Sequence, residues 1–230
     1  MHWRTVVRMD PNKGAVIRGY QGLEDTVRKG AREYSGDSFG KNSFSGNEPN
    51  RLFLSSRGQR FTDLTGISGA GHTGDGRTFA LLDFDRDGWC DIASVNSNAP
   101  KLVLFRNEIG GLIDKATPRG TIALRFLGGN TSPSPSARFS NRDGYGARVS
   151  VELEGLTLTR EHTCGQGVFT QNSTTMLIGI GEAQSVKSVT VRWPSDVQQT
   201  VESVSPGTLL TVRENAEAGS AFSRTPYHNP

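Results

Sequence analysis

Nine residues, Asp83–Asp91, hold the clearest arrangement of side chains that could bind a ligand. Their pattern is D-x-D-x-D-G-x-x-D, in which three aspartates at alternate positions are followed by a glycine and a fourth aspartate. Carboxylate oxygens are the ligands that hard cations prefer, and Gly88 lets the backbone turn so that they can surround one ion. Without an ion the acidic groups would repel one another, with only Arg86 to offset them. The sequence therefore predicts a calcium site whose occupancy is coupled to the order of the loop.

The residues beside this acidic loop indicate a strand-loop-strand arrangement. Phe79–Leu82 precedes it and Ile92–Val95 follows it, and both are apolar runs too short for helices. An EF-hand needs flanking helices and a glutamate at the twelfth position, whereas the last acid here is Asp91, the ninth. The alternative is a solvated acidic turn without an ion. If calcium binds, a structural role is expected, because all the carboxylates would serve as ligands.

The composition favours a β-rich fold. The chain of 230 residues is long enough for one large domain or two small ones. It holds 28 glycines and only 34% hydrophobic residues, with Val, Thr and Ser common between the glycines, which favours many short strands and turns over helices. No apolar run approaches the length of a membrane span. The net charge of +3 is modest and the arginines near the start lack interleaved aromatic residues, so nucleic acid is not expected as a partner.

The two cysteines, Cys90 and Cys164, allow at most one disulfide bond. Cys90 lies in the acidic loop, where a small buried residue is expected, and the prediction is therefore two free thiols. The first residues carry no apolar segment typical of a secretion signal, so the cellular compartment stays open.

The distribution of apolar runs predicts four regions and an all-β fold. Residues 1–49 form an N-terminal segment without a clear pattern. Residues 50–110 hold short apolar runs that predict a small antiparallel sheet containing the acidic loop. Residues 120–214 hold further short runs, several of them alternating, which is typical of an antiparallel sandwich or barrel. Residues 215–230 are small and polar, which predicts a disordered tail.

Two glycine-rich stretches outside the acidic loop could bind a ligand. His72 and Asp75 lie close in sequence to the acidic loop and could line a pocket; the alternative is an ordinary loop. Gln166, Phe169 and Gln171 lie in the second stretch and offer amide contacts and an aromatic surface for stacking. The alternative there is a tight crossing of strands in the sandwich.

Short sequence motifs in the first predicted sheet resemble an FG-GAP/VCBS propeller repeat. These motifs are Asn50–Leu54, Arg60–Leu64, Gly76–Arg77, Leu82–Gly88 and Leu104–Asn107. In that family the acidic loop binds calcium within a blade. The resemblance implies that the ligands are Asp83, Asp85, Asp87, the main-chain carbonyl of Trp89, and Asp91.

Short motifs in residues 120–214 resemble the ASPIC/UnbV domain, which follows FG-GAP repeats in proteins similar to cartilage acidic protein. They are Asn141–Val149, Gly165–Gln171, Ile178–Gly181 and Val191–Ser195. This resemblance implies an extracellular or cell-surface location. Asp196 departs from the pattern, because the family tends to have glycine there, and we expect only a local change of turn.

Only one propeller-type repeat is clear, and a single blade cannot bury both of its faces. The exposed face of the blade could be covered by the sandwich, by the N-terminal segment, or by another chain in a homo-oligomer. The predicted function is a calcium-binding, non-catalytic binding or adhesion module whose ligand is a protein, a glycan or a small molecule. The alternative is an enzyme or cyclase-like catalyst in which calcium is structural and His72, Asp75 or Gln171 acts. That alternative requires a concave pocket with a convergent acid or base.

Overall fold

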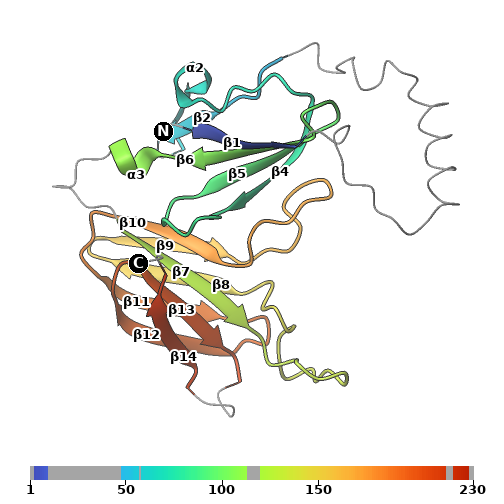
Figure 1. The fold of residues 1–230 in the computed structure, drawn as a ribbon. Coiled ribbons are helices and arrows are strands. Elements are labelled where there is room, and N and C mark those ends of the chain that lie inside the picture. The colour runs from blue at the N-terminus through green and yellow to red at the C-terminus, as the bar shows by residue number, and fades with distance from the viewer. Residues whose placement is uncertain (1–2, 10–47, 57, 113–119, 216–219, 228–230) are drawn as a thin grey trace, which may run out of the picture. The chain divides into compact units, whose positions relative to one another are not determined.

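The computed structural model describes residues 3–9, 48–56, 58–112, 120–215 and 220–227. The chain divides into two compact units (Figure 1). Unit 1 comprises Met1–Ala80, Asp91–Ile109 and Gly167–Phe169, and unit 2 comprises Leu81–Cys90, Gly110–Gln166 and Thr170–Pro230.

Unit 1 is built on a four-stranded sheet with the strand order β1-β6-β5-β4. Both β1 and β5 pair with β6 in the antiparallel sense. Alternate residues of β6 are buried, as expected for a strand with one face on a core. Val103 and Phe105 supply that face and form a small apolar cluster with Ala70. The strands are β1 (Trp3–Met9), β4 (Gly76–Leu82), β5 (Asp91–Asn96) and β6 (Leu102–Asn107).

Short elements complete this part of the chain. A two-stranded hairpin of β2 (Phe53–Ser56) and β3 (Arg60–Asp63) exposes all of its side chains. The helix α2 (Thr65–Ser68) ends at Gly69, whose φ of +78° is the left-handed conformation that glycine adopts without strain. A second four-residue helix, α3 (Ile109–Leu112), follows β6.

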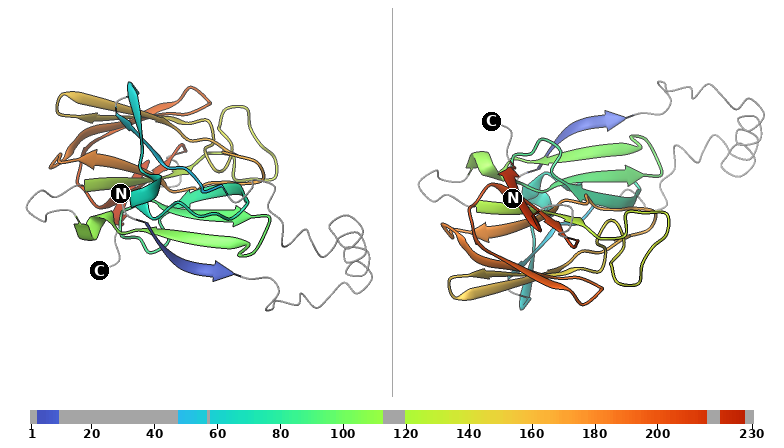
Figure 2. Two further views of the ribbon diagram at one scale, coloured as in Figure 1. Left: turned by 90° about the horizontal axis from the view of Figure 1, so that it is seen from above. Right: turned by 90° about the horizontal axis from the view of Figure 1, so that it is seen from below.

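Unit 2 is a sandwich of two four-stranded sheets (Figures 1 and 2). One sheet has the order β10-β7-β13-β14 and the other β12-β11-β8-β9. Pairing is antiparallel except between β7 and β13, which run parallel. The strands are β7 (Gly120–Leu127), β8 (Arg148–Leu153), β9 (Leu156–Glu161), β10 (Met176–Gly181), β11 (Val186–Arg192), β12 (Gln198–Val204), β13 (Thr208–Arg213) and β14 (Phe222–Pro226).

Apolar residues from both sheets fill the space between them. Alternation along β8 and β11 sends valines inward, which is the period-two pattern of a half-buried strand. Trp193 is the largest fully buried side chain, and its indole Nε1 donates a hydrogen bond of 2.8 Å to Gln199 Oε1. The all-β prediction is therefore confirmed, as is the sandwich. The parallel pairing of β7 with β13 was not predicted, because it joins segments far apart in the sequence.

The predicted disordered tail is wrong for Phe222–Pro226, which form β14 on the edge of β13. Phe222 packs against the sandwich core, and Tyr227 is only 8% exposed. The main-chain amide of Tyr227 donates to the Gly207 carbonyl at 2.8 Å. Two aromatic anchors thus hold a segment whose average composition is polar.

Candidate metal centre and polar pocket

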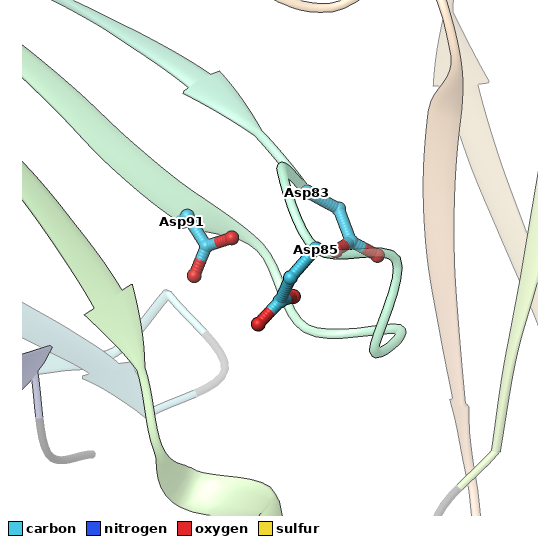
Figure 3. Close-up of side chains that lie close together, drawn as sticks. All are labelled: Asp83, Asp85 and Asp91. Atoms are coloured by element: carbon cyan, nitrogen blue, oxygen red, sulfur yellow. The ribbon is translucent and has the colours of Figure 1, made fainter. Parts of the chain in front are cut away.

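The acidic loop joins β4 to β5 and brings three of its four carboxylates together. Asp83, Asp85 and Asp91 each offer an oxygen, and these oxygens all lie within 4.8 Å of one another (Figure 3). Oxygens that share one calcium ion at about 2.4 Å are at most about 5 Å apart, so the spacing fits this ion. Asp91 is fully buried, whereas the other two are half-buried. The three residues belong to one continuous stretch, so local backbone geometry sets their positions.

Left-handed backbone conformations make the turn that gathers them. Arg86 has a φ of +57° and Gly88 a φ of +88°. The amides of Asp87 and Gly88 donate to the two carboxylate oxygens of Asp83, at 3.1 and 2.9 Å. The side chain of Asp83 therefore holds the loop by accepting hydrogen bonds from two of its main-chain amides, as in Asx-type turns.

Asp87 is not in the group of three. Its carboxylate accepts a hydrogen bond of 2.9 Å from the Trp89 amide. The Trp89 indole lies against Gly110, where an added Cβ would meet Nε1 at 2.5 Å. Asp91 Oδ1 accepts from the Asn107 amide at 2.7 Å. The predicted ligand set is thus divided in this structure, with three carboxylates converging and the fourth capping the turn.

Burial raises the pKa of Asp83, and the nearby charge of Asp87 adds to that rise. The amide of Gly88 and the side chain of Tyr227 act in the opposite direction, because both hydrogen-bond the carboxylate. Burial and the Asp83 charge also raise the pKa of Tyr227, which therefore stays a neutral phenol. Sequence analysis missed this partner because it treated the C-terminal residues as a disordered tail.

A pocket of about 280 Å³ lies within unit 2. It includes Gln166 and Gln171, two of the residues expected in a ligand site, together with Asp83 and Cys90 of the acidic loop. The remaining lining comes from the end of β4, the end of β9, the segment between β9 and β10, and the start of β10. These residues are Leu81, Leu82, Arg160, Glu161, His162, Thr163, Asn172, Ser173, Thr175, Met176 and Leu177.

The other predicted site residues lie elsewhere. Asp75 is 1% exposed and accepts hydrogen bonds from Arg77 at 2.7 Å and from the Ser97 hydroxyl at 2.6 Å. His72 Nδ1 accepts from the Gly74 amide at 2.8 Å. Neither His72 nor Asp75 lines the pocket of unit 2. Phe169 is completely exposed and has a φ of +57°.

His162 belongs to an aromatic stack beside the pocket. Its ring lies 4.6 Å from the Phe126 ring and 4.7 Å from the Tyr145 ring, measured between centroids. Burial lowers the pKa of His162, which keeps the imidazole neutral near pH 7. Its Nε2 lies 3.2 Å from the Asp143 carbonyl oxygen, so Nε2 carries the proton and donates.

Glu214 forms a second carboxylate cluster, one that sequence analysis missed. It is 5% exposed and accepts from the Gly129 amide at 2.7 Å and from the Ser140 amide and hydroxyl, both at 2.8 Å. The Ser195 hydroxyl is its fourth donor. An acid directly after the alternating strand β13 was the available signal, but its partners are distant in sequence. This cluster joins three loops of the sandwich.

Neither Cys90, which is half-buried, nor Cys164, which is exposed, is in a disulfide bond in the described part of the chain. In the described part of the chain, no helix has the length and apolar character needed to span a membrane.

Comparison with known proteins identifies part of unit 2. Residues 138–219 match the family described as ASPIC and UnbV. No curated protein matches the chain. The matched segment contains the strands from β8 to β13, Glu214 and the pocket residues between Arg160 and Leu177, whereas β7, β14 and the acidic loop lie outside it. The predicted resemblance to the ASPIC/UnbV domain is confirmed for residues 138–219, which match its family model.

Proposed function

We propose that this chain is a calcium-binding, non-catalytic binding module. In this proposal residues 50–110 are a repeat of the FG-GAP/VCBS type, joined to the ASPIC/UnbV domain as in proteins similar to cartilage acidic protein. The observation that carries the proposal is the convergence of the carboxylates of Asp83, Asp85 and Asp91 within 4.8 Å.

The chemistry of the donors favours calcium over other ions. The converging groups are all carboxylates, whereas zinc sites usually contain histidine or cysteine. Calcium accepts 6–8 oxygens at about 2.3–2.6 Å in flexible geometry, so main-chain carbonyls and water can complete its shell. Magnesium demands a near-ideal octahedron at about 2.0–2.1 Å, which a glycine-containing loop does not enforce. Asp83, Asp85 and Asp91 would hold the ion.

The role proposed for calcium is structural. The acidic loop contains four aspartates and one arginine, so a divalent cation would offset most of its negative charge. Asp83 also hydrogen-bonds Tyr227, which links the order of the loop to the residue after β14. A bound ion would therefore stabilise the loop and, through it, the C-terminal segment.

A binding function without catalysis is supported by the state of the histidine in the pocket. The His162 side chain is only 5% exposed, and its ring is stacked on those of Phe126 and Tyr145. A general acid or base must instead present a nitrogen within hydrogen-bond reach of a reacting group. The polar groups of the pocket are thus better suited to hydrogen-bonding a ligand.

Thermal unfolding in excess calcium and in excess chelator tests the proposal. An ion present at 100 times its Kd adds about 2.7 kcal/mol to the free energy of unfolding. For a domain of this size, that corresponds to a rise in Tm of roughly 5–10 °C. Asp85→Asn should remove the rise, whereas Asp196→Asn, at an exposed aspartate outside the loop, should keep it. Equal Tm values in the two conditions, with no calcium uptake by titration calorimetry, would contradict the proposal.

A further inference from the structure

The pocket of unit 2 has features that point to one class of ligand. We propose that it binds an uncharged, hydroxyl-rich ligand of the chemical class of a neutral saccharide unit. This inference rests on the proposed function and deepens it, because it names what the binding module would bind.

The size of the pocket limits the ligand. Its volume of about 280 Å³ is just below the range of typical small-molecule sites, about 300–1,000 Å³. A ligand of one sugar ring, or part of a longer chain, is compatible with this space. A large cofactor or an extended peptide is not.

The wall formed by Gln166 and residues 171–173 is fixed to the end of β4. The Leu81 amide donates to Asn172 Oδ1 at 2.8 Å, and the Ser173 amide donates to the Leu81 carbonyl at 2.9 Å. One side-chain and one main-chain hydrogen bond thus tie this loop to Leu81. A wall that is ordered before binding reduces the entropy lost when a ligand is bound.

Side-chain amides line this wall and hold one another in place. Gln166 donates to the Thr163 hydroxyl and accepts from Asn172 Nδ2. Gln171 Oε1 accepts from the Gly165 amide at 2.5 Å. Each primary amide has two N–H donors and an oxygen with two lone pairs, so these bonds leave both donors and acceptors for a ligand. Sugar hydroxyls are themselves donors and acceptors, and such a mixed set suits them.

The charges on the lining indicate a neutral ligand. Arg160 and Glu161 are neighbours and offset each other, while His162 is neutral. The remaining charge is that of Asp83, which calcium would neutralise. Recognition of a phosphate or sulfate would need an excess of cationic donors, which the lining lacks.

Apolar side chains provide the other requirement of a sugar site. Leu81, Leu82, Met176 and Leu177 are half-buried and line the pocket, where they could meet the C–H groups of a sugar ring. Phe169, which was predicted to offer a stacking surface, does not line this pocket.

Saturation-transfer NMR in the presence of calcium tests the inference. The probes are glucose, galactose, mannose, fucose and the two N-acetylhexosamines, with glucose 6-phosphate, glucuronate and a blocked Ser-Gln dipeptide as comparators. We expect transfer to at least one neutral sugar, with a Kd raised at least tenfold in Gln166→Ala. Gln184→Ala is the matched control, because Gln184 is an exposed amide outside the pocket, and its Kd should equal that of the wild type.

Every other outcome overturns the inference. No transfer to any neutral sugar excludes this ligand class, and stronger binding of a charged comparator or of the dipeptide assigns the pocket to another. An unchanged Kd in Gln166→Ala places the sugar elsewhere on the protein. Calcium-dependent Tm values, measured on the same samples, separate the two proposals. If calcium stabilises the protein and no sugar binds, only the ligand class fails; if a sugar binds without calcium-dependent stability, only the metal proposal fails.

Discussion

Glu214 and the acidic loop differ in how their carboxylates are stabilised within the fold. Glu214 is a single carboxylate that accepts four hydrogen bonds from amides and hydroxyls of the sandwich. The acidic loop instead brings three carboxylates within 4.8 Å of one another. Neutral donors can satisfy one buried charge, because each hydrogen bond replaces one lost to water. They do not remove the repulsion between three adjacent charges, for which a cation is the direct remedy.

The comparison separates two sources of stability. The Glu214 cluster is complete without an ion and lies beside a core of sixteen buried residues. The acidic loop is the part of the structure whose stability we expect to depend on calcium. Four predictions test this division, from the largest expected effect to the smallest.

The largest effect is expected for Glu214→Ala. The substitution leaves two amides and two hydroxyls of the sandwich loops without their acceptor, and the cost should be about 3 kcal/mol in free energy of unfolding. Urea unfolding measures this loss, which should be the same in calcium and in chelator. Glu154→Ala, at an exposed turn, is the control and should change stability by less than about 0.5 kcal/mol. A loss seen only in calcium would show that the two clusters are not independent.

Asp85→Asn and Asp87→Asn should differ in the stability that each loses in calcium, relative to its stability in chelator. Asp85→Asn removes one of the converging carboxylates and should lower stability in calcium by about 2 kcal/mol. In chelator the same variant should equal or exceed the wild type, because one repelling charge is gone. Asp87→Asn retains an oxygen for the Trp89 amide and should lose less in calcium. Equal losses would show that Asp87 joins the ligand set when calcium binds, as the sequence resemblance implied.

Tyr227→Phe should cost about 1 kcal/mol, the usual value of one hydrogen bond. The hydroxyl contacts Asp83, so the loss reports on the link between the acidic loop and the C-terminal segment. Tyr145→Phe is a matched control, since Tyr145 stacks on His162 through its ring. Chemical denaturation of both variants in calcium is the measurement. Equal stability of Tyr227→Phe and the wild type would mean that the loop and the tail are not coupled.

The smallest expected effect is the pH dependence of stability that comes from His162 in the sandwich. Burial lowers the pKa of His162 in the folded protein below its unfolded value of about 6.5. Between these two values the unfolded chain binds the proton more readily, so stability falls as the pH drops below about 6.5 and levels off above it. His162→Phe keeps an aromatic ring in the stack but cannot titrate, and its stability should depend less on pH between about 5 and 8. Identical pH dependence in urea unfolding would refute the assignment.

Local pattern was enough to predict the inward-facing residues of β8 and β11 and the acidic loop, although it missed β14. Alternation places inward valines on β8 and β11 because successive side chains of a strand point to opposite faces, whatever the strand pairs with. The spacing of Asp83 and Asp85 around a glycine turn likewise brings their carboxylates close, since only a few backbone angles separate them. Such features depend on neighbours in the chain and are readable from it. The motifs shared with the ASPIC/UnbV domain were readable for the same reason.

Only the tertiary structure decided which distant groups meet. Glu214 reaches Gly129 and Ser140 because β13 pairs with β7, and no local pattern encodes that parallel pairing. Tyr227 reaches Asp83 because β14 adds to the sheet edge, a step that the polar composition of the tail concealed. The sequence by itself determined an all-β chain with an acidic turn, because both follow from short-range backbone geometry. The donors around each carboxylate were decided by packing, because burial selects contacts between segments that sequence spacing leaves far apart.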